Sequence, residues 1–172
     1  MPGSLVLIQE VECAGVSTAT LTGIDSTYDV YVCQFNNVKT GTDSKNIGLQ
    51  VTVSGSADTT ANYDSAFKFF RTDTTFSNVS ATNGTSVTVT ASAGNDAGLG
   101  SNASIYLFNF NNSSEYSFAT VEQVYMNLDP TLMGYQGGFV HTVAQSCDGI
   151  KFTNESSANW DSGTFKLYGI KK

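Results

Sequence analysis

Apolar and polar residues alternate along much of the chain with the period of two that is typical of β-strands. From Tyr31 to Phe35, every second residue is aromatic or cysteine. Segments 49–54 and 87–91 repeat the pattern, with aliphatic residues separated by Thr, Gln or Ser. We interpret these segments as antiparallel strands with one face in the core and the other in water.

Two further segments differ because they are apolar on both faces. Residues 105–110 read IYLFNF, and residues 165–170 are apolar on nearly every position. A strand of this kind is expected to be covered on both sides. No segment predicts a helix.

Clusters of Gly, Asn, Asp and Ser separate the strand segments, which gives roughly ten strands. The two prolines, Pro2 and Pro130, leave the predicted sheets uninterrupted. This pattern predicts an all-β, jelly-roll-like antiparallel β-sandwich rather than alternating βαβ units. An immunoglobulin-type sandwich fits less well, because Trp160 does not lie between two spaced cysteines.

The length of 172 residues fits a single domain over residues 1–172, with residues 1–13 as an N-terminal docking arm or a first strand. Charged residues make up only 13% of the chain, about half the usual share. The net charge of −7 disfavours nucleic acid as a partner. The sequence has neither a secretory signal nor an apolar stretch that predicts membrane insertion. A polar but largely neutral surface suits subunit packing or contact with sugars.

Cysteine and histidine are too sparse for the common metal and nucleophile sites. Cys13, Cys33 and Cys147 are widely spaced, which fits neither a zinc site nor a disulfide framework. We expect buried free thiols, although a Cys13–Cys33 bridge is an open alternative. His141, the one histidine, lies in an alternating segment and is interpreted as a hydrogen-bonded or interfacial strand residue.

The sequence marks no catalytic residue, so we expect no enzymatic activity, no metal and no cofactor. A glycosidase pair of carboxylates remains open, since its two members need only be neighbours in space. Asp25, Asp29 and loop 94–100 offer oxygen ligands, but their spacing does not match a calcium loop and turn formation is the expected role.

Aromatic residues make up 12% of the chain, and most have the spacing of strand residues that pack a core. A few lie near predicted turns, where they could form a protein interface or a platform for glycans. These candidates are Tyr63, Phe76, Tyr116, Tyr135 and Trp160.

The segment 161–171, DSGTFKLYGIK, resembles the closing strand of tailed-bacteriophage virion proteins, in which a Gly-Thr-hydrophobic-x-Leu-Tyr-Gly-Ile-Lys ending recurs. Segments 22–31, 47–54 and 149–152 are similar to earlier strands of those proteins. The resemblance implies a jelly-roll-like structural protein of the virion, assembled in the host cytoplasm. Such proteins are head decorations, head fibres or tail tips, usually homotrimers.

Three hypotheses follow. The first is a non-enzymatic capsid decoration or cement protein that binds the major capsid protein as a homo-oligomer, with a trimer suspected. This hypothesis is favoured because the chain has no long repetitive stem. The alternative is the receptor- or glycan-binding tip of a tail or head fibre, which would use Tyr135 and Trp160 to contact a host-surface glycan. The third is a glycan-degrading enzyme.

Overall fold

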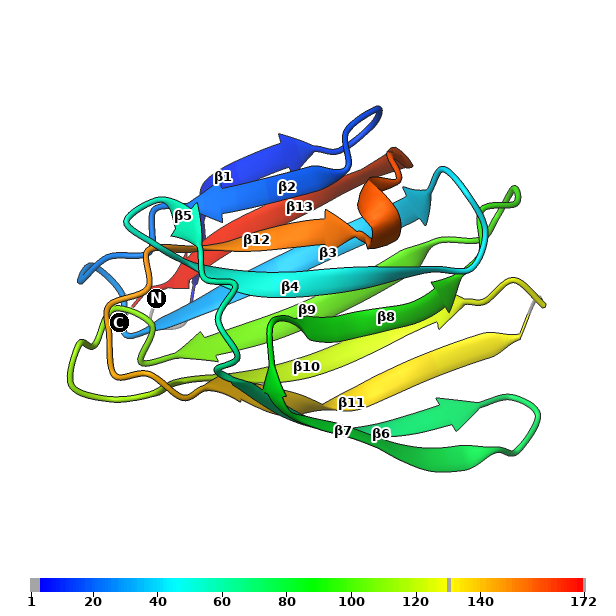
Figure 1. Ribbon diagram of the computed structural model, residues 1–172. Coiled ribbons are helices and arrows are strands. Elements are labelled where there is room, and N and C mark those ends of the chain that lie inside the picture. Colours follow the sequence, from blue (N-terminus) through cyan, green and yellow to red (C-terminus); the bar gives the residue numbers. More distant parts are fainter. Residues whose placement is uncertain (1–3, 130, 172) are drawn as a thin grey trace.

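A computed structural model describes residues 4–129 and 131–171. Two antiparallel sheets pack face to face, so the predicted all-β sandwich is confirmed (Figure 1). The described residues form thirteen strands rather than roughly ten, with one short 3₁₀ turn at Glu155–Ser157. The prediction missed strands such as Phe76–Gly84, because that segment is polar and contains no regular apolar alternation.

The larger sheet has eight strands and the smaller has five. In spatial order the larger sheet contains β1 (Leu5–Glu12), β13 (Trp160–Ile170), β3 (Val30–Thr40), β9 (Ser101–Phe108), β10 (Ser117–Met126), β11 (Leu132–His141), β6 (Tyr63–Arg71) and β7 (Phe76–Gly84). The smaller sheet contains β2 (Thr18–Thr22), β12 (Gly149–Asn154), β4 (Lys45–Val53) and β5 (Ser56–Ala57), and β8 (Val87–Ala93) pairs with β4.

The strand pairing is that of a jelly roll with two insertions. In the order β1, β2, β3, β4, β8, β9, β12, β13, the first strand pairs with the last, the second with the seventh, the third with the sixth and the fourth with the fifth. This nested pairing is a long hairpin rolled into two sheets. The hairpins β6–β7 and β10–β11 are inserted into it, and both extend the larger sheet beyond β9.

The N-terminal segment is part of this sheet. Leu5–Glu12 forms β1 and pairs antiparallel with β13, so it is the first strand rather than a detached arm. Residues 1–3 and Pro130 lie outside the described residues.

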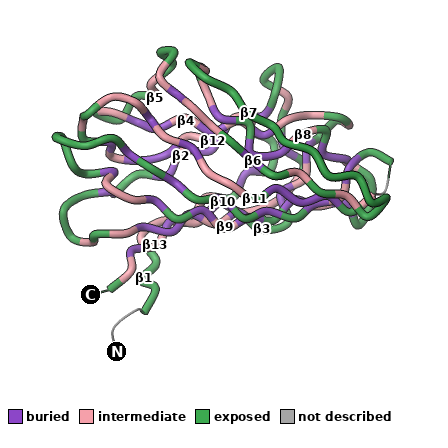
Figure 2. The backbone as a smooth tube through the Cα atoms, turned by 90° about the horizontal axis from the view of Figure 1, so that it is seen from below, coloured by how far each residue is buried: buried purple, intermediate pink, exposed green. Residues whose placement is uncertain are grey.

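The buried residues gather between the two sheets (Figure 2), and the core combines aliphatic side chains with a group of packed aromatic rings. Phe152 stacks on Phe165 with ring centroids 4.5 Å apart, and Phe35 and Trp160 contact Phe165 at 5.6 and 5.2 Å. The predicted inward alternation of β3 is confirmed, since Tyr31, Cys33 and Phe35 are buried.

The expectation that segment 105–110 is covered on both faces is wrong. Ile105 and Leu107 are fully buried, but Tyr106 between them is 43% exposed. The smaller sheet covers only the inner face of β9, and none of the described elements covers its outer face. The second apolar face of this segment, which contains Tyr106, is therefore exposed at the surface of the molecule.

The three cysteines are free and buried, so the alternative of a Cys13–Cys33 bridge is excluded. Burial raises the pKa of the Cys13 thiol to about 11 and that of Cys33 further still, which keeps both thiols protonated at neutral pH. None of the described residues forms a helix long and apolar enough to cross a membrane.

Candidate functional site

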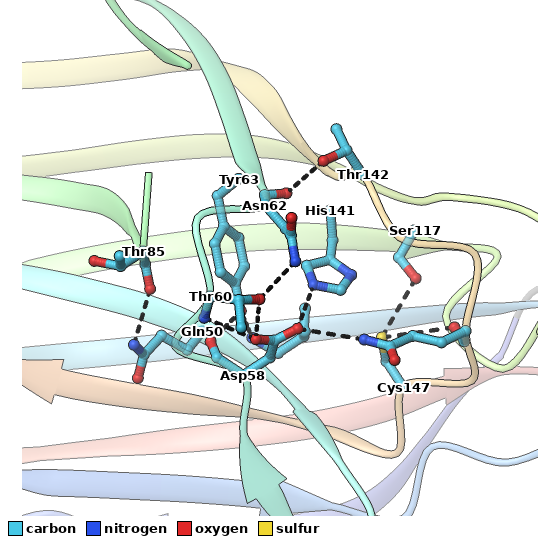
Figure 3. A network of polar contacts seen from close by, with 12 residues as sticks. Gln50, Asp58, Thr60, Asn62, Tyr63, Thr85, Ser117, His141, Thr142 and Cys147 are labelled. Carbon is cyan, nitrogen blue, oxygen red and sulfur yellow. Dashed lines mark hydrogen bonds and ion pairs between the residues drawn. The ribbon is translucent and has the colours of Figure 1, made fainter. Parts of the chain in front are cut away.

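A compact polar cluster joins the loop before β6 to the end of β11 (Figure 3). His141 has no exposed surface, and its Nε2 lies 2.9 Å from Oδ2 of Asp58. Asp58 also accepts hydrogen bonds from the backbone N–H and the hydroxyl of Thr60, and from the side chain of Gln145 at 3.3 Å. Because a carboxylate only accepts hydrogen bonds, Nε2 of His141 carries the proton in this contact.

Tyr63 connects this cluster to the smaller sheet. Its hydroxyl donates to the backbone oxygen of Asp58 at 2.7 Å and accepts the backbone N–H of Val51 on β4 at 3.1 Å. Its ring lies 5.1 Å from the ring of His141. Burial raises the pKa of the Tyr63 hydroxyl, so it stays protonated and keeps its donor.

Cys147 and Ser117 lie beside this cluster, and both are completely buried. The Ser117 hydroxyl contacts the Cys147 sulfur at 3.6 Å, and burial raises the pKa of that thiol. A nucleophile needs access to a substrate and an ionised or activated form. In the described conformation these residues have no open path to solvent, and the cluster acts as a clamp between strands.

Three of the five predicted aromatic candidates are buried, which corrects their assignment to an exposed platform. Tyr63 and Trp160 are each 1% exposed, and Tyr135 is 4% exposed. Tyr63 and Trp160 are the first residues of β6 and β13, so turn-proximal residues point inward there. Tyr135 lies in the middle of β11 and packs on Phe67 and Phe69.

The other two candidates are exposed but lie apart. Phe76 is 66% exposed at the start of β7, and Tyr116 is 46% exposed just before β10. The row of paired residues that contains Phe76 meets β10 at Val124, near the opposite end of β10 from Tyr116. They do not form one site.

The outer face of the larger sheet carries the candidate Phe76 together with apolar residues that sequence reasoning did not select as a site. One row of paired residues crosses four strands from Val124 through Gly134 and Phe70 to Phe76. Phe118 and Phe108 begin a second row, with Val140 beside Phe118. The signal that could have found this face was the two-faced apolar pattern around Tyr106.

Exposure is high across this outer face. Phe118 and Val124 are each 45% exposed, and Tyr106 is 43% exposed. A groove of about 510 Å³ runs between Phe118 and β7, with Gly138 and Ala66 among its lining residues. These residues form two groups, with Phe118 and Tyr106 near one end of β10 and Val124, Phe70 and Phe76 near the other. Exposed apolar residues gathered on one face of a sheet favour contact with another molecule. We call the set Phe70, Phe76, Tyr106, Phe118 and Val124 the outer apolar face.

Comparisons with known proteins found no matching family, no matching curated protein and no matching solved structure.

Proposed function

We propose that this protein is a non-enzymatic structural component of a bacteriophage particle, which decorates the head by binding the major capsid protein. The observation that carries the proposal is the outer apolar face, which lies on a sheet that two inserted hairpins widen beyond the sandwich. The jelly roll and the phage-like ending of segment 161–171 agree with this assignment.

The mechanism is stabilisation by mass action. A subunit that binds the assembled shell and not its free parts lowers the free energy of the shell with every copy bound. The surface suits this task because few charges must lose water when the surface is covered. The suspected trimer belongs to the same proposal, since several copies that bind together gain avidity.

The receptor-binding alternative loses its named residues, because Tyr135 and Trp160 are buried. Binding to host-surface glycans without binding to heads would contradict decoration.

Location is the first test of this proposal. Electron microscopy of intact particles labelled with an antibody against this chain should place the label over the whole head. Label confined to the tail, or purified protein that coats host cells and fails to bind isolated heads, would reject decoration.

Two variants at exposed apolar residues test whether the outer apolar face binds the head. Phe118→Ser on the outer apolar face should weaken binding to isolated heads at least about tenfold, as truncation of a central aromatic contact does. Val16→Ser is the control, because Val16 is 44% exposed but lies outside this face. Both variants should keep the wild-type thermal unfolding temperature to within a few degrees. Equal binding by both variants would show that the head contacts another surface.

A further inference from the structure

The strand β7 forms one edge of the larger sheet and has β6 as its neighbour. Eight of its nine residues are exposed, from Phe76 to Asn83, so both of its faces are open to solvent (Figure 2). The backbone along the open side has no strand partner among the described residues. Such an edge is a template for pairing with another strand.

The other sheet edges are interrupted, bonded to another strand or very short. On β1, the acidic Glu10 and an irregularity next to Gln9 interrupt the edge. The Gln9 side chain accepts the backbone N–H of Thr22 on β2 at 2.6 Å. The Tyr125 hydroxyl donates to the backbone oxygen of Ala91 on β8 at 2.7 Å, and β5 has only two residues.

From Phe76 to Ala81, β7 pairs regularly with β6 and carries none of the usual protective residues, and a bulge at Thr82–Asn83 interrupts only its last part. Its sequence FSNVSATNG contains no charged residue and no proline. Phe76 and Val79 leave 66% and 41% of their surface exposed. We propose that this edge binds a second copy of this chain, by antiparallel pairing of β7 with β7 about a two-fold axis at Ser80.

The charged residues beside β7 favour antiparallel pairing with a second copy of the chain. The Lys68 ammonium donates a hydrogen bond to the side-chain oxygen of Asn78 at 3.3 Å. The Asp64 carboxylate accepts one from the backbone N–H of Asn83 at 2.8 Å. One end of β7 is therefore positive and the other negative. Antiparallel pairing brings the positive end of each copy against the negative end of the other, whereas parallel pairing brings like charges together.

The register follows from the same contacts. A two-fold axis perpendicular to the sheet keeps inner and outer faces matched, so the axis passes through one residue. An axis at Ser80 sets Asn78 opposite Thr82 of the second copy. The Lys68 ammonium over Asn78 then faces the end of the second β7 where Asp64 of that copy binds Asn83, with the two β7 strands between them. An axis at Asn78 would instead bring the two Lys68 side chains together.

The bulge at Thr82–Asn83 limits regular pairing in this register to the residues from Asn78 to Thr82 of each copy. The two larger sheets then form one continuous sheet, and their outer apolar faces become neighbours. This pairing goes beyond the proposed function and does not depend on it, and it differs from the three-fold association that the phage resemblance implies.

Sedimentation velocity of the full chain over a wide range of concentrations tests the proposal. The wild type should dimerise reversibly. Ser80→Lys and Ser80→Glu each place two like charges across the axis, and each should weaken dimerisation about tenfold or more. An equimolar mixture of the two variants should associate again as a heterodimer. Ser113→Lys, in an exposed loop far along the chain from β7, is the control and should dimerise as the wild type does.

Several outcomes would overturn this pairing: a wild type that stays monomeric at every concentration, variants that dimerise normally, or a mixture that does not associate. Circular dichroism of each variant shows that it is folded. The result is separable from the proposed function. If a monomeric Ser80→Lys variant still binds heads, decoration is supported without the edge pairing. If the wild type dimerises but binds no heads, the edge pairing is supported and decoration is rejected.

Discussion

At the scale of single residues, Asp58 shows how a partly buried carboxylate is stabilised at the border of a core. Burial alone would raise the pKa of the Asp58 carboxyl, but hydrogen bonds from Thr60 and His141 outweigh that effect and hold the pKa below its usual range. A carboxylate with a lowered pKa in the folded state contributes stability above its unfolded pKa. That stability is lost as the pH falls through the folded pKa.

We therefore expect Asp58→Asn to lower the free energy of unfolding by about 1–3 kcal/mol at neutral pH. The difference from the wild type should shrink below about pH 4, because the wild-type carboxyl is then protonated too. Urea unfolding at neutral and acidic pH measures both quantities. Asp161→Asn is the control, since Asp161 forms an exposed ion pair with Lys39 and should change stability by at most about 1 kcal/mol. A difference for Asp58→Asn that does not change with pH would contradict this assignment.

At the scale of elements, β13 shows how a long strand is fitted to its neighbours. Its register with β3 shifts twice, between Trp160 and Ser162 and between Ser162 and Thr164. Gly163 lies in this irregular part with φ +121°, a conformation that side chains disfavour. A Cβ atom on Gly163 would also lie 2.5 Å from Cα of Val38. The irregular segment allows Trp160 to enter the core while the rest of β13 stays paired.

Gly163→Ala should therefore destabilise the protein more than an ordinary glycine replacement at positive φ. Gly55→Ala is the matched control, because Gly55 has φ +77° and nothing within 4 Å of its added Cβ. The control should cost about 1–2 kcal/mol from backbone strain alone. Gly163→Ala should exceed it by at least about 1 kcal/mol, because backbone atoms must also shift. Equal losses in thermal or urea unfolding would show that β13 accommodates the methyl group.

At the scale of the whole molecule, the inserted hairpins are not separate units. Phe67 on β6 and Val121 on β10 belong to the same buried cluster as Phe165 on β13. The strand β3 pairs with both β13 and β9, and the polar cluster at Asp58 ties the hairpins to the smaller sheet. The jelly roll and its insertions therefore share one core.

One cooperative unfolding transition is the expected consequence. Differential scanning calorimetry should give equal calorimetric and van't Hoff enthalpies. Asp58→Asn and Gly163→Ala, which act in different parts of the fold, should both shift this single transition to lower temperature. Two resolved transitions, of which each variant moves only one, would show that the hairpins unfold independently.

Several features were predictable from the sequence because they depend on local periodicity. The alternation around Tyr31 and Phe35 predicted a strand with a buried face, and the repeated turns predicted an all-β sandwich. The strand β7 was missed because its polar sequence carries no such period. It forms because β6 offers it a hydrogen-bonding partner, which is a non-local cause.

The sequence by itself determined the class of the fold and the inner residues of its regular strands, because side chains of a strand alternate with a fixed period of two. Only the tertiary structure decided which apolar face stays open. Tyr106 and Phe118 have the apolar character of core residues, and they are exposed because none of the described elements covers the outer face of the larger sheet. The reverse holds for Tyr63 and Trp160, whose places beside turns gave no sign that contacts with β4 and β3 would help to bury them.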